Sequence, residues 1–287
     1  MPSLEQLRRA VSWAAREVGI RQSCCAKVRV LPWSATANLS IGQRRYWVKV
    51  SPPRNSTIES KILTLARERR LSSVPTLVSS SDDLNTILME HVPSHPGTLR
   101  AADIVASKNR VCDALTNQAE QLDLTALTAS GCADIILSNC RNRSPWIDIA
   151  TMYALAKMVE ACDVELADLD RSLPRVTGVV HGDFHPGNVL TSLGGPVFID
   201  WADAAYGAQI WDQATFEISS GQLTNIGNSS DAHFSVIAGL KEIADFLLTP
   251  HPIPGGMYSV SIPHLRTHIS RRAATLIYSL GILRHSE

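Results

Sequence analysis

Asp183 and Asn188 lie in the densest cluster of reactive residue types in the chain, which reads His-Gly-Asp-Phe-His-Pro-Gly-Asn from position 181. A second cluster, Ile-Asp-Trp-Ala-Asp-Ala from position 199, contributes Asp200. Phosphoryl transfer requires a carboxylate that accepts the proton of the attacking hydroxyl, and oxygen ligands that fix Mg²⁺ on nucleotide phosphates. Asp183 suits the first role, and Asn188 with Asp200 suits the second. Carboxylates that follow buried strands are costly without a cation, which favours chemistry over a structural role.

Lys49 and Glu59 supply a cation upstream of these clusters. Lys49 lies in an expected strand, and Glu59 opens the following expected helix ten residues later. In this layout the two side chains are close enough to pair, which would hold the ammonium over the α- and β-phosphates. A strand lysine taken alone is more often solvated, and a first-turn glutamate also favours a helix dipole. The spacing of the two residues relative to the downstream clusters favours the ion pair.

Hydrophobic periodicity indicates the elements that carry these residues. The strand-rich first part contains a helix over 4–18, three strands between 26 and 50, a helix over about 57–69, and strands at 75–78 and 86–89. The second part, after His95-Pro96-Gly97, contains helical stretches at about 101–128 and 148–167 and short strands at 178–180 and 196–199. We expect these last two strands to be adjacent and antiparallel, so that they hold Asp183, Asn188 and Asp200 at one edge of a pocket.

With these motifs in place, the chain resembles the aminoglycoside phosphotransferase and choline kinase group, the small-molecule branch of the protein-kinase-like fold. The resemblance extends from about residue 26 to 216. Its core is a two-part signature, His-Gly-Asp-x-His-Pro-x-Asn and Ile-Asp-Trp-x-Asp-Ala-x-x-Gly-x-x-x-x-Asp, matched from His181 to Asn188 and from Ile199 to Asp212. Two motifs with the right residue types, order and gap rarely coincide, so the match is highly specific.

The resemblance implies a role for each residue of the signature. Asp183 would be the catalytic base, and Asn188 and Asp200 would be the Mg²⁺ ligands. Lys49 and Glu59 would be the pair that positions the phosphates.

The resemblance also implies contacts for the nucleotide base and for the catalytic loop. The segment Met89-Glu90-His91-Val92 lies where the family's hinge meets adenine, mainly through backbone groups. Asp212 is similar to the buried carboxylate that ties down the family's catalytic loop. The turn between residues 33 and 38 has no glycine, unlike the Gly-rich loop of protein kinases. Donors to the phosphates could come instead from the backbone and side chains of Ser34, Thr36 and Asn38.

Two further departures argue against a Ser/Thr/Tyr protein kinase. Gly182 replaces the arginine of His-Arg-Asp, so nothing there can grip a phosphorylated activation loop. The gap between Asp200 and Asp212 is too short for such a loop, and no Ala-Pro-Glu follows. We therefore expect an enzyme that is constitutively competent.

Composition sets the broad class. The chain has 287 residues and a formal net charge of +0, which argues against nucleic acid as the main partner. No signal peptide or membrane span is expected, and the six cysteines contain no C-x-x-C pair, so we interpret them as reduced thiols of a cytoplasmic protein. We expect a monomer or weak dimer.

These observations together predict an α+β, bilobal protein-kinase-like fold. The small N-terminal lobe, residues 1–92, would contain an antiparallel five-stranded sheet and one main helix and bind the nucleotide. The mostly helical C-terminal lobe, residues 93–287, would carry the catalytic loops and bind the acceptor. ATP, with GTP as a possible alternative, and Mg²⁺ would be the cofactors.

The acceptor is the least determined part of the function. Polycationic aminoglycosides need an acidic pocket, yet residues 213–287 carry as many basic as acidic side chains, leaving histidine aside. We expect a hydroxyl of a less cationic small molecule, an antibiotic or another sugar-bearing natural product. A metabolic kinase acting on choline, homoserine or a sugar stays open as an alternative, as does a non-catalytic nucleotide-binding relative.

Overall fold

The computed structural model describes residues 3–19, 24–31, 34–140, 147–173, 177–220, 229–248 and 262–285. The chain divides into two compact units. The first combines residues 1–124 with 178–205, and the second combines 125–177 with 206–287. The expected N-terminal lobe, residues 1–92, lies within the first unit, and the lobe boundary after residue 92 stays a prediction.

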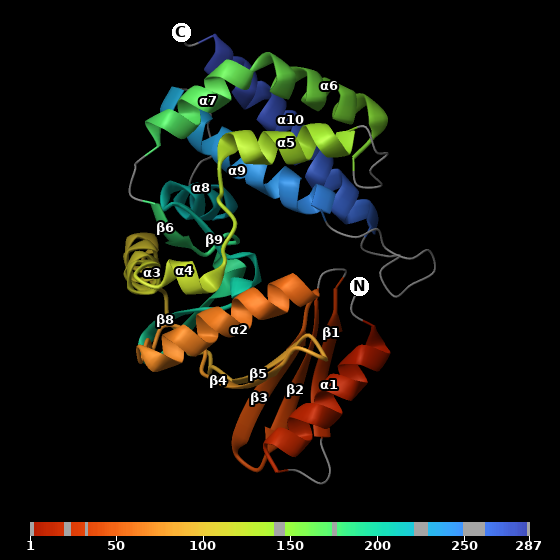
Figure 1. Cartoon of the computed structure of the whole chain (residues 1–287), viewed down its shortest axis with the longest axis vertical. Coiled ribbons are helices and arrows are strands. Elements are labelled where there is room, and N and C mark those ends of the chain that lie inside the picture. Colours follow the sequence, from red (N-terminus) through yellow and green to blue (C-terminus); the bar gives the residue numbers. More distant parts are fainter. Residues whose placement is uncertain are drawn as a thin grey trace. The chain divides into compact units, whose positions relative to one another are not determined.

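The first unit begins with helix α1 (Leu4–Glu17), which starts at a capping box. The Ser3 hydroxyl accepts from the Gln6 backbone N–H, and the Gln6 side chain accepts from the Ser3 backbone N–H, so two otherwise unpaired donors are satisfied. Leu7, Ala10 and Ala14 form the buried face of the helix. This face packs on the sheet that follows (Figure 1).

The sheet of the first unit has five antiparallel strands in the order β1-β2-β3-β5-β4. Their bounds are β1 (Cys24–Val30), β2 (Ala35–Ile41), β3 (Arg44–Val50), β4 (Leu77–Ser81) and β5 (Thr86–Glu90). Side chains alternate between the two faces of a strand. Ala37 and Val48, which pair across β2 and β3, belong to the core under α1. Lys49 therefore lies on the opposite face, in register with Thr36 and Ile87.

Three elements differ from expectation. Strand β2 begins at Ala35, so Thr36 and Asn38, expected in a turn between residues 33 and 38, lie in the strand. Helix α2 (Pro53–Glu68) starts four residues earlier than predicted, because Pro53 has no N–H to leave unpaired and suits the first turn of a helix. Strand β4 extends to Ser81, where Ser80 and Ser81 pair with Ile87 and Thr86. Backbone pairing with β5 thus overrides the low strand propensity of the serines.

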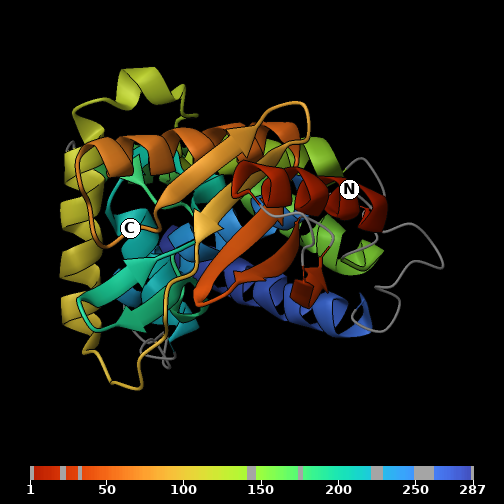
Figure 2. The same cartoon turned by 90° about the horizontal axis from the view of Figure 1, so that it is seen from below.

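The first unit is completed by segments that come from further along the sequence. The predicted helix over 101–128 is instead α3 (Ala101–Thr116) and α4 (Ala119–Leu122), and Asp123 after α4 has a left-handed backbone. Strand β8 (Gly195–Phe198) runs beside α3 and pairs with β7 (Val189–Ser192), as Figure 2 shows. The remaining elements here are β6 (Thr177–Val180), η1 (Pro186–Asn188) and η2 (Trp201–Asp203).

The partner of β8 corrects the expected strand order. We predicted that 178–180 and 196–199 would pair, but β8 forms a hairpin with β7, which was not predicted. Strand β7 begins directly after Asn188, and the hairpin turn follows at Leu193 and Gly194. A local hairpin has a small loop-closure cost, which favours this pairing over a more distant one.

The second unit is a helical bundle with its own core. Helices α5, α6, α9 and α10 pack against one another (Figure 1). The predicted helix over 148–167 is divided at Cys162 into α6 and α7. No helix in the described part of the chain is long and apolar enough to cross a membrane. The elements of this region are α5 (Ala129–Cys140), α6 (Ile149–Ala161), α7 (Asp163–Ser172), β9 (Ala205–Ala208), α8 (Ile210–Ser219), α9 (Ser229–Leu248) and α10 (Ile262–Arg284).

Candidate active site

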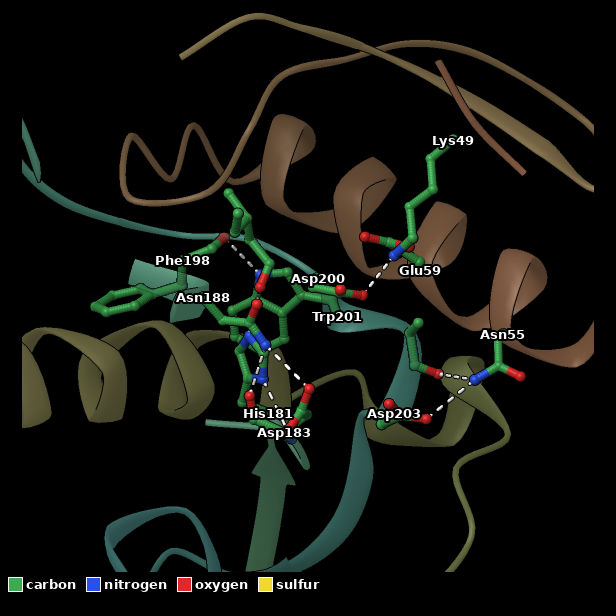
Figure 3. Close-up of polar contacts among 12 residues, drawn as sticks. Lys49, Asn55, Glu59, His181, Asp183, Asn188, Phe198, Asp200, Trp201 and Asp203 are labelled. Carbon is green, nitrogen blue, oxygen red and sulfur yellow. Dashed lines mark hydrogen bonds and ion pairs between the residues drawn. The ribbon is translucent and has the colours of Figure 1, made fainter. Parts of the chain in front are cut away.

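Lys49 joins three elements of the first unit at one point. Its ammonium nitrogen lies 2.6 Å from Glu59 Oε2 on α2 and 2.5 Å from Asp200 Oδ1 after β8 (Figure 3). Lys49 and Glu59 are buried, whereas the Asp200 side chain is 35% exposed. The predicted ion pair between Lys49 and Glu59 is therefore present. The direct contact between Lys49 and Asp200 was not predicted.

The electrostatics of this cluster follow from one ammonium shared by two carboxylates. Burial acts to lower the pKa of Lys49, but Asp200 and Glu59 raise the pKa by more than burial lowers it, so the ammonium stays protonated. Burial raises the pKa of Glu59 to about 7 against the opposing effect of Lys49. Burial also acts to raise the pKa of Asp200, but Lys49 and the two nearby histidines bring it below its ordinary value. The carboxylate that stays charged is thus the exposed one.

Asp183 is held in place by Asn188. The Asn188 amide nitrogen donates to the Asp183 backbone oxygen at 2.9 Å and to Asp183 Oδ2 at 3.1 Å. His185 Nε2 lies 3.6 Å from the same carboxylate oxygen. The Asp183 side chain is 41% exposed, so a substrate hydroxyl can approach it. An oriented, accessible carboxylate is what a general base requires.

His181 has a structural role behind the two acidic residues. It is fully buried, its Nε2 donates to the Ile199 backbone oxygen at 2.9 Å, and its ring lies 4.5 Å from the Trp201 ring. Trp201 is buried as well and donates its indole N–H to the Phe198 backbone oxygen at 2.9 Å. These contacts connect the residue before the Asp183 loop to the residues on both sides of Asp200.

The Asp200 backbone is left-handed, with φ 66° and ψ 60°. This conformation costs a non-glycine residue about 1–2 kcal/mol, so the surrounding contacts must hold it. Gly182, with φ +82°, lies against the same segment. A Cβ built on Gly182 would lie 1.8 Å from the Asp203 backbone oxygen. Glycine at this position lets the two loops approach closely, which explains the departure from His-Arg-Asp.

Asn188 and Asp200 fit a Mg²⁺ site. The Asn188 amide nitrogen is used on Asp183, which leaves the amide oxygen as the atom that a metal could contact. Asp200 has a second carboxylate oxygen besides the one that contacts Lys49. Magnesium is bound through one or two side-chain oxygens together with substrate phosphates.

The residues predicted to contact the nucleotide phosphates lie in or beside strand β2. Thr36 and Asn38 lie on the Lys49 face of β2, and Asn38 Oδ1 is buried without a hydrogen-bond partner among the described residues. Ser34 precedes β2 and is buried. All three lie in or next to the strand beside Lys49.

The hinge residues follow at the end of β5, where Met89 and Glu90 are its last two residues. The backbone N–H groups of Glu90 and His91 already donate to Thr76 and Arg45 oxygens. These two N–H groups are thus already used within the first unit, and the expected contact of this segment with adenine stays a prediction. The His91 ring is stacked with Trp47 at 6.1 Å.

Two further residues complete the comparison with the sequence. Asn55 was not predicted, and the role predicted for Asp212 is not tested by the structure. The amide of Asn55, on α2, contacts the segment after Asp200, and no motif indicated it. Its position in the first turn of a helix four residues before Glu59 is the only signal in the sequence. Asp212 is buried near the start of α8, in the second unit, and its predicted tie to the catalytic loop stays a prediction.

The sequence profile of the phosphotransferase enzyme family matches residues 32–216. The chain belongs to this family. It is a small-molecule kinase, as the resemblance implied. None of the curated proteins matches the sequence significantly.

Solved structures share its fold. One is the aminoglycoside phosphotransferase APH(4)-Ia with ADP and hygromycin B, which is 14% identical with a TM-score of 0.60 over 94% of this chain and 98% of that one. The choline kinase LicA from Streptococcus pneumoniae is also 14% identical, with a TM-score of 0.60 over 94% and 99%. A putative aminoglycoside phosphotransferase from Ralstonia eutropha is 12% identical, with a TM-score of 0.53 over 97% and 98%. The predicted kinase-like fold is thus confirmed.

Proposed function

We propose that this kinase transfers the γ-phosphoryl group of ATP to a hydroxyl of a small molecule in a Mg²⁺-dependent reaction. The observation that carries the proposal is the Lys49 ammonium held between Glu59 and Asp200, in the same unit as an Asp183 carboxylate oriented by Asn188. Asn188 and Asp200 would hold Mg²⁺, which would supply charge neutralisation on the phosphates. Glu59 keeps the ammonium in place when Lys49 turns from Asp200 to the phosphates.

Asp183 acts on the acceptor. Its Oδ2 already accepts from the Asn188 amide, so the carboxylate is fixed and its other oxygen can accept the proton of the acceptor hydroxyl. The deprotonating hydroxyl then attacks the γ-phosphorus in line with the departing oxygen of ADP. Positioning and charge neutralisation account for most of the catalysis in this reaction class.

Several acidic side chains of the second unit already have partners, which supports an acceptor that is not a polycation. Glu242 pairs with His268 and Arg272, and Asp245 pairs with Lys241. Asp170 accepts from the backbone N–H groups of Ala129 and Ser130 at the start of α5. Asp148 is the N-cap of α6, and Asp168 pairs with Arg171. Acidic groups that already have partners offer little to a cationic sugar, which favours an antibiotic or other sugar-bearing natural product of low charge.

A panel of acceptors tests the substrate class. Purified protein with MgATP is incubated with neutral and cationic antibiotics, nucleosides, choline, homoserine and sugars, and phosphate addition is detected by mass and ADP release. We expect phosphorylation of a weakly charged, polyhydroxylated compound. Turnover confined to kanamycin- or neomycin-like compounds would contradict the charge argument, and turnover of choline or homoserine alone would indicate the metabolic alternative.

The base role of Asp183 is tested by Asp183→Asn. The amide keeps the shape and an acceptor for the Asn188 bond but cannot take a proton, so we expect kcat to fall by roughly 10²- to 10⁴-fold. ATP affinity in the presence of Mg²⁺, measured by calorimetry, should change little because Asn188, Asp200 and Lys49 remain. Asp83→Asn, in the exposed β4–β5 turn, is the matched control. Undiminished turnover in Asp183→Asn would remove this residue from the base role.

A further inference from the structure

Asn55 connects α2 directly to the segment that follows Asp200. Its amide nitrogen donates to the Ala202 backbone oxygen at 3.0 Å and to Asp203 Oδ1 at 3.0 Å. Figure 3 shows this side chain pointing from α2 to the loop that carries Asp200 and Asp203. Both partners belong to η2, the single helical turn that begins after Asp200.

Asn55 and Glu59 make two separate connections from the same helix. Residues four apart lie on one face of a helix, one turn from each other. Glu59 reaches Asp200 through the Lys49 ammonium, and Asn55 reaches the residues two and three positions beyond Asp200. The Asp200 segment is therefore fixed to α2 at both of its ends.

The connection made by Asn55 matters because of the Asp200 backbone. Asp200 is held in a left-handed conformation that a non-glycine residue avoids when its surroundings allow it. When nucleotide phosphates attract Lys49, the ion pair to Asp200 weakens. The amide of Asn55 carries no charge, so its two bonds persist and keep the turn after Asp200 in place.

We propose that Asn55 is a positioning residue that keeps the Asp200 carboxylate in its metal-binding orientation while the nucleotide is bound. The proposal rests on the function proposed above, in which Asp200 binds Mg²⁺. Asn55 touches neither the metal nor the substrate in this scheme. It acts through the η2 backbone, and its loss lowers the affinity for Mg²⁺ rather than the affinity for the nucleotide itself.

Asn55→Ala and Asn55→Asp test the proposal. Alanine removes both donors, and aspartate keeps the size but places a carboxylate beside Asp203, so aspartate has the larger effect. Calorimetry measures ATP affinity in Mg²⁺ and in EDTA, and the Mg²⁺ concentration for half-maximal activity is measured with the acceptor found by the panel. We expect that concentration to rise about tenfold in Asn55→Ala and further in Asn55→Asp. ATP affinity in EDTA and the acceptor KM stay within twofold of wild type.

The matched control is Ser60→Ala, which removes a hydroxyl from the next turn of the same helix. The Ser60 hydroxyl donates to the Thr57 backbone oxygen within α2. This variant keeps the wild-type Mg²⁺ dependence. A lowered Tm with unchanged Mg²⁺ dependence in both Asn55 variants would show a merely structural role and overturn the inference. If wild-type protein gains no ATP affinity from Mg²⁺, the proposed function itself fails, and the inference fails with it.

Discussion

At the scale of single residues, the central feature is one ammonium between two carboxylates of unequal exposure. Lys49 contacts both Glu59 and Asp200, but only Asp200 is partly exposed. Breaking a buried pair on one side leaves an uncompensated charge, so each of the three residues depends on the other two. In the proposed function, Glu59 stays out of the chemistry and only holds the lysine.

Glu59→Gln should therefore weaken nucleotide handling and alter the pH dependence of stability. Loss of a charge-assisted bond to Lys49 costs about 1.5–3 kcal/mol, or roughly 10- to 100-fold in kcat/KM for ATP. Burial raises the folded-state pKa of Glu59 to about 7 from an ordinary 4.5. The native state therefore binds more protons than the unfolded state between these values, and the contribution of Glu59 to stability falls as pH rises through that window.

The measurement is urea unfolding of wild type and Glu59→Gln between pH 4.5 and 7.5. We expect the free energy of unfolding of wild type, relative to the variant, to decrease as the pH rises. Glu68→Gln, at the exposed end of α2, is the control and should show no such trend. A relative stability that increases with pH would mean that Lys49, and not burial, dominates the titration of Glu59.

At the scale of elements, the site depends on loops that approach each other closely and on a helix beneath them. Phe184, next to Asp183, is fully buried against Phe198 of β8. Lys108 of α3 is fully buried too, and its ammonium lies 5.3 Å from the centroid of the Phe184 ring. A cation over an aromatic face is favourable when both are desolvated. The loop that carries Asp183 is thus packed through Phe184 against β8 and α3, while Gly182 permits its close approach to η2.

Gly182→Ala should damage the enzyme more than a glycine substitution with free space around it. The alanine must keep the left-handed backbone of Gly182, and its Cβ clashes with the Asp203 backbone oxygen. Together the two effects cost roughly 2–5 kcal/mol. Gly42→Ala, at φ +55° with nothing within 4 Å of the Cβ, carries only the backbone cost of about 1–2 kcal/mol. Chemical denaturation and kcat of both variants provide the comparison. Equal destabilisation of the two would show that the loops separate without cost.

At the scale of the whole molecule, the chain contains two compact units with separate apolar cores. Each unit buries free cysteines. Cys112 lies in the first, and Cys132 and Cys162 lie in the second. Burial raises the pKa of Cys132 to about 12 and raises that of Cys162 as well. Only the thiolate reacts with alkylating reagents, so these thiols are inert while the units stay folded.

Alkylation followed by peptide mass analysis measures this protection. At pH 8, we expect Cys112, Cys132 and Cys162 to react roughly 100-fold or more slowly in native protein than in urea, because reaction requires opening of the surrounding core. Because the cysteines report on both units, their relative rates show which unit opens first. Rapid labelling of Cys132 in native protein would contradict its burial.

The sequence by itself determined the parts of this protein that are local. The two motifs identified Asp183, Asn188 and Asp200, and alternation together with helical periodicity predicted the five-stranded sheet and α2. The pairing of Lys49 with Glu59 was also predictable, because a strand followed directly by a helix brings residues ten positions apart together. Such features depend on spacing along a short stretch of chain, which the order of residues specifies directly.

Tertiary structure alone decided the contacts between distant segments. The ion pair of Lys49 with Asp200, the bonds from Asn55 to η2 and the approach of Gly182 to Asp203 each join different elements. The partner of β8 was mispredicted for a different reason, because β7, its neighbour in the sequence, was not recognised as a strand. Composition and periodicity report which face of an element is buried, but not which other element covers it. That choice depends on the packing of the whole core, where many small terms of similar size compete.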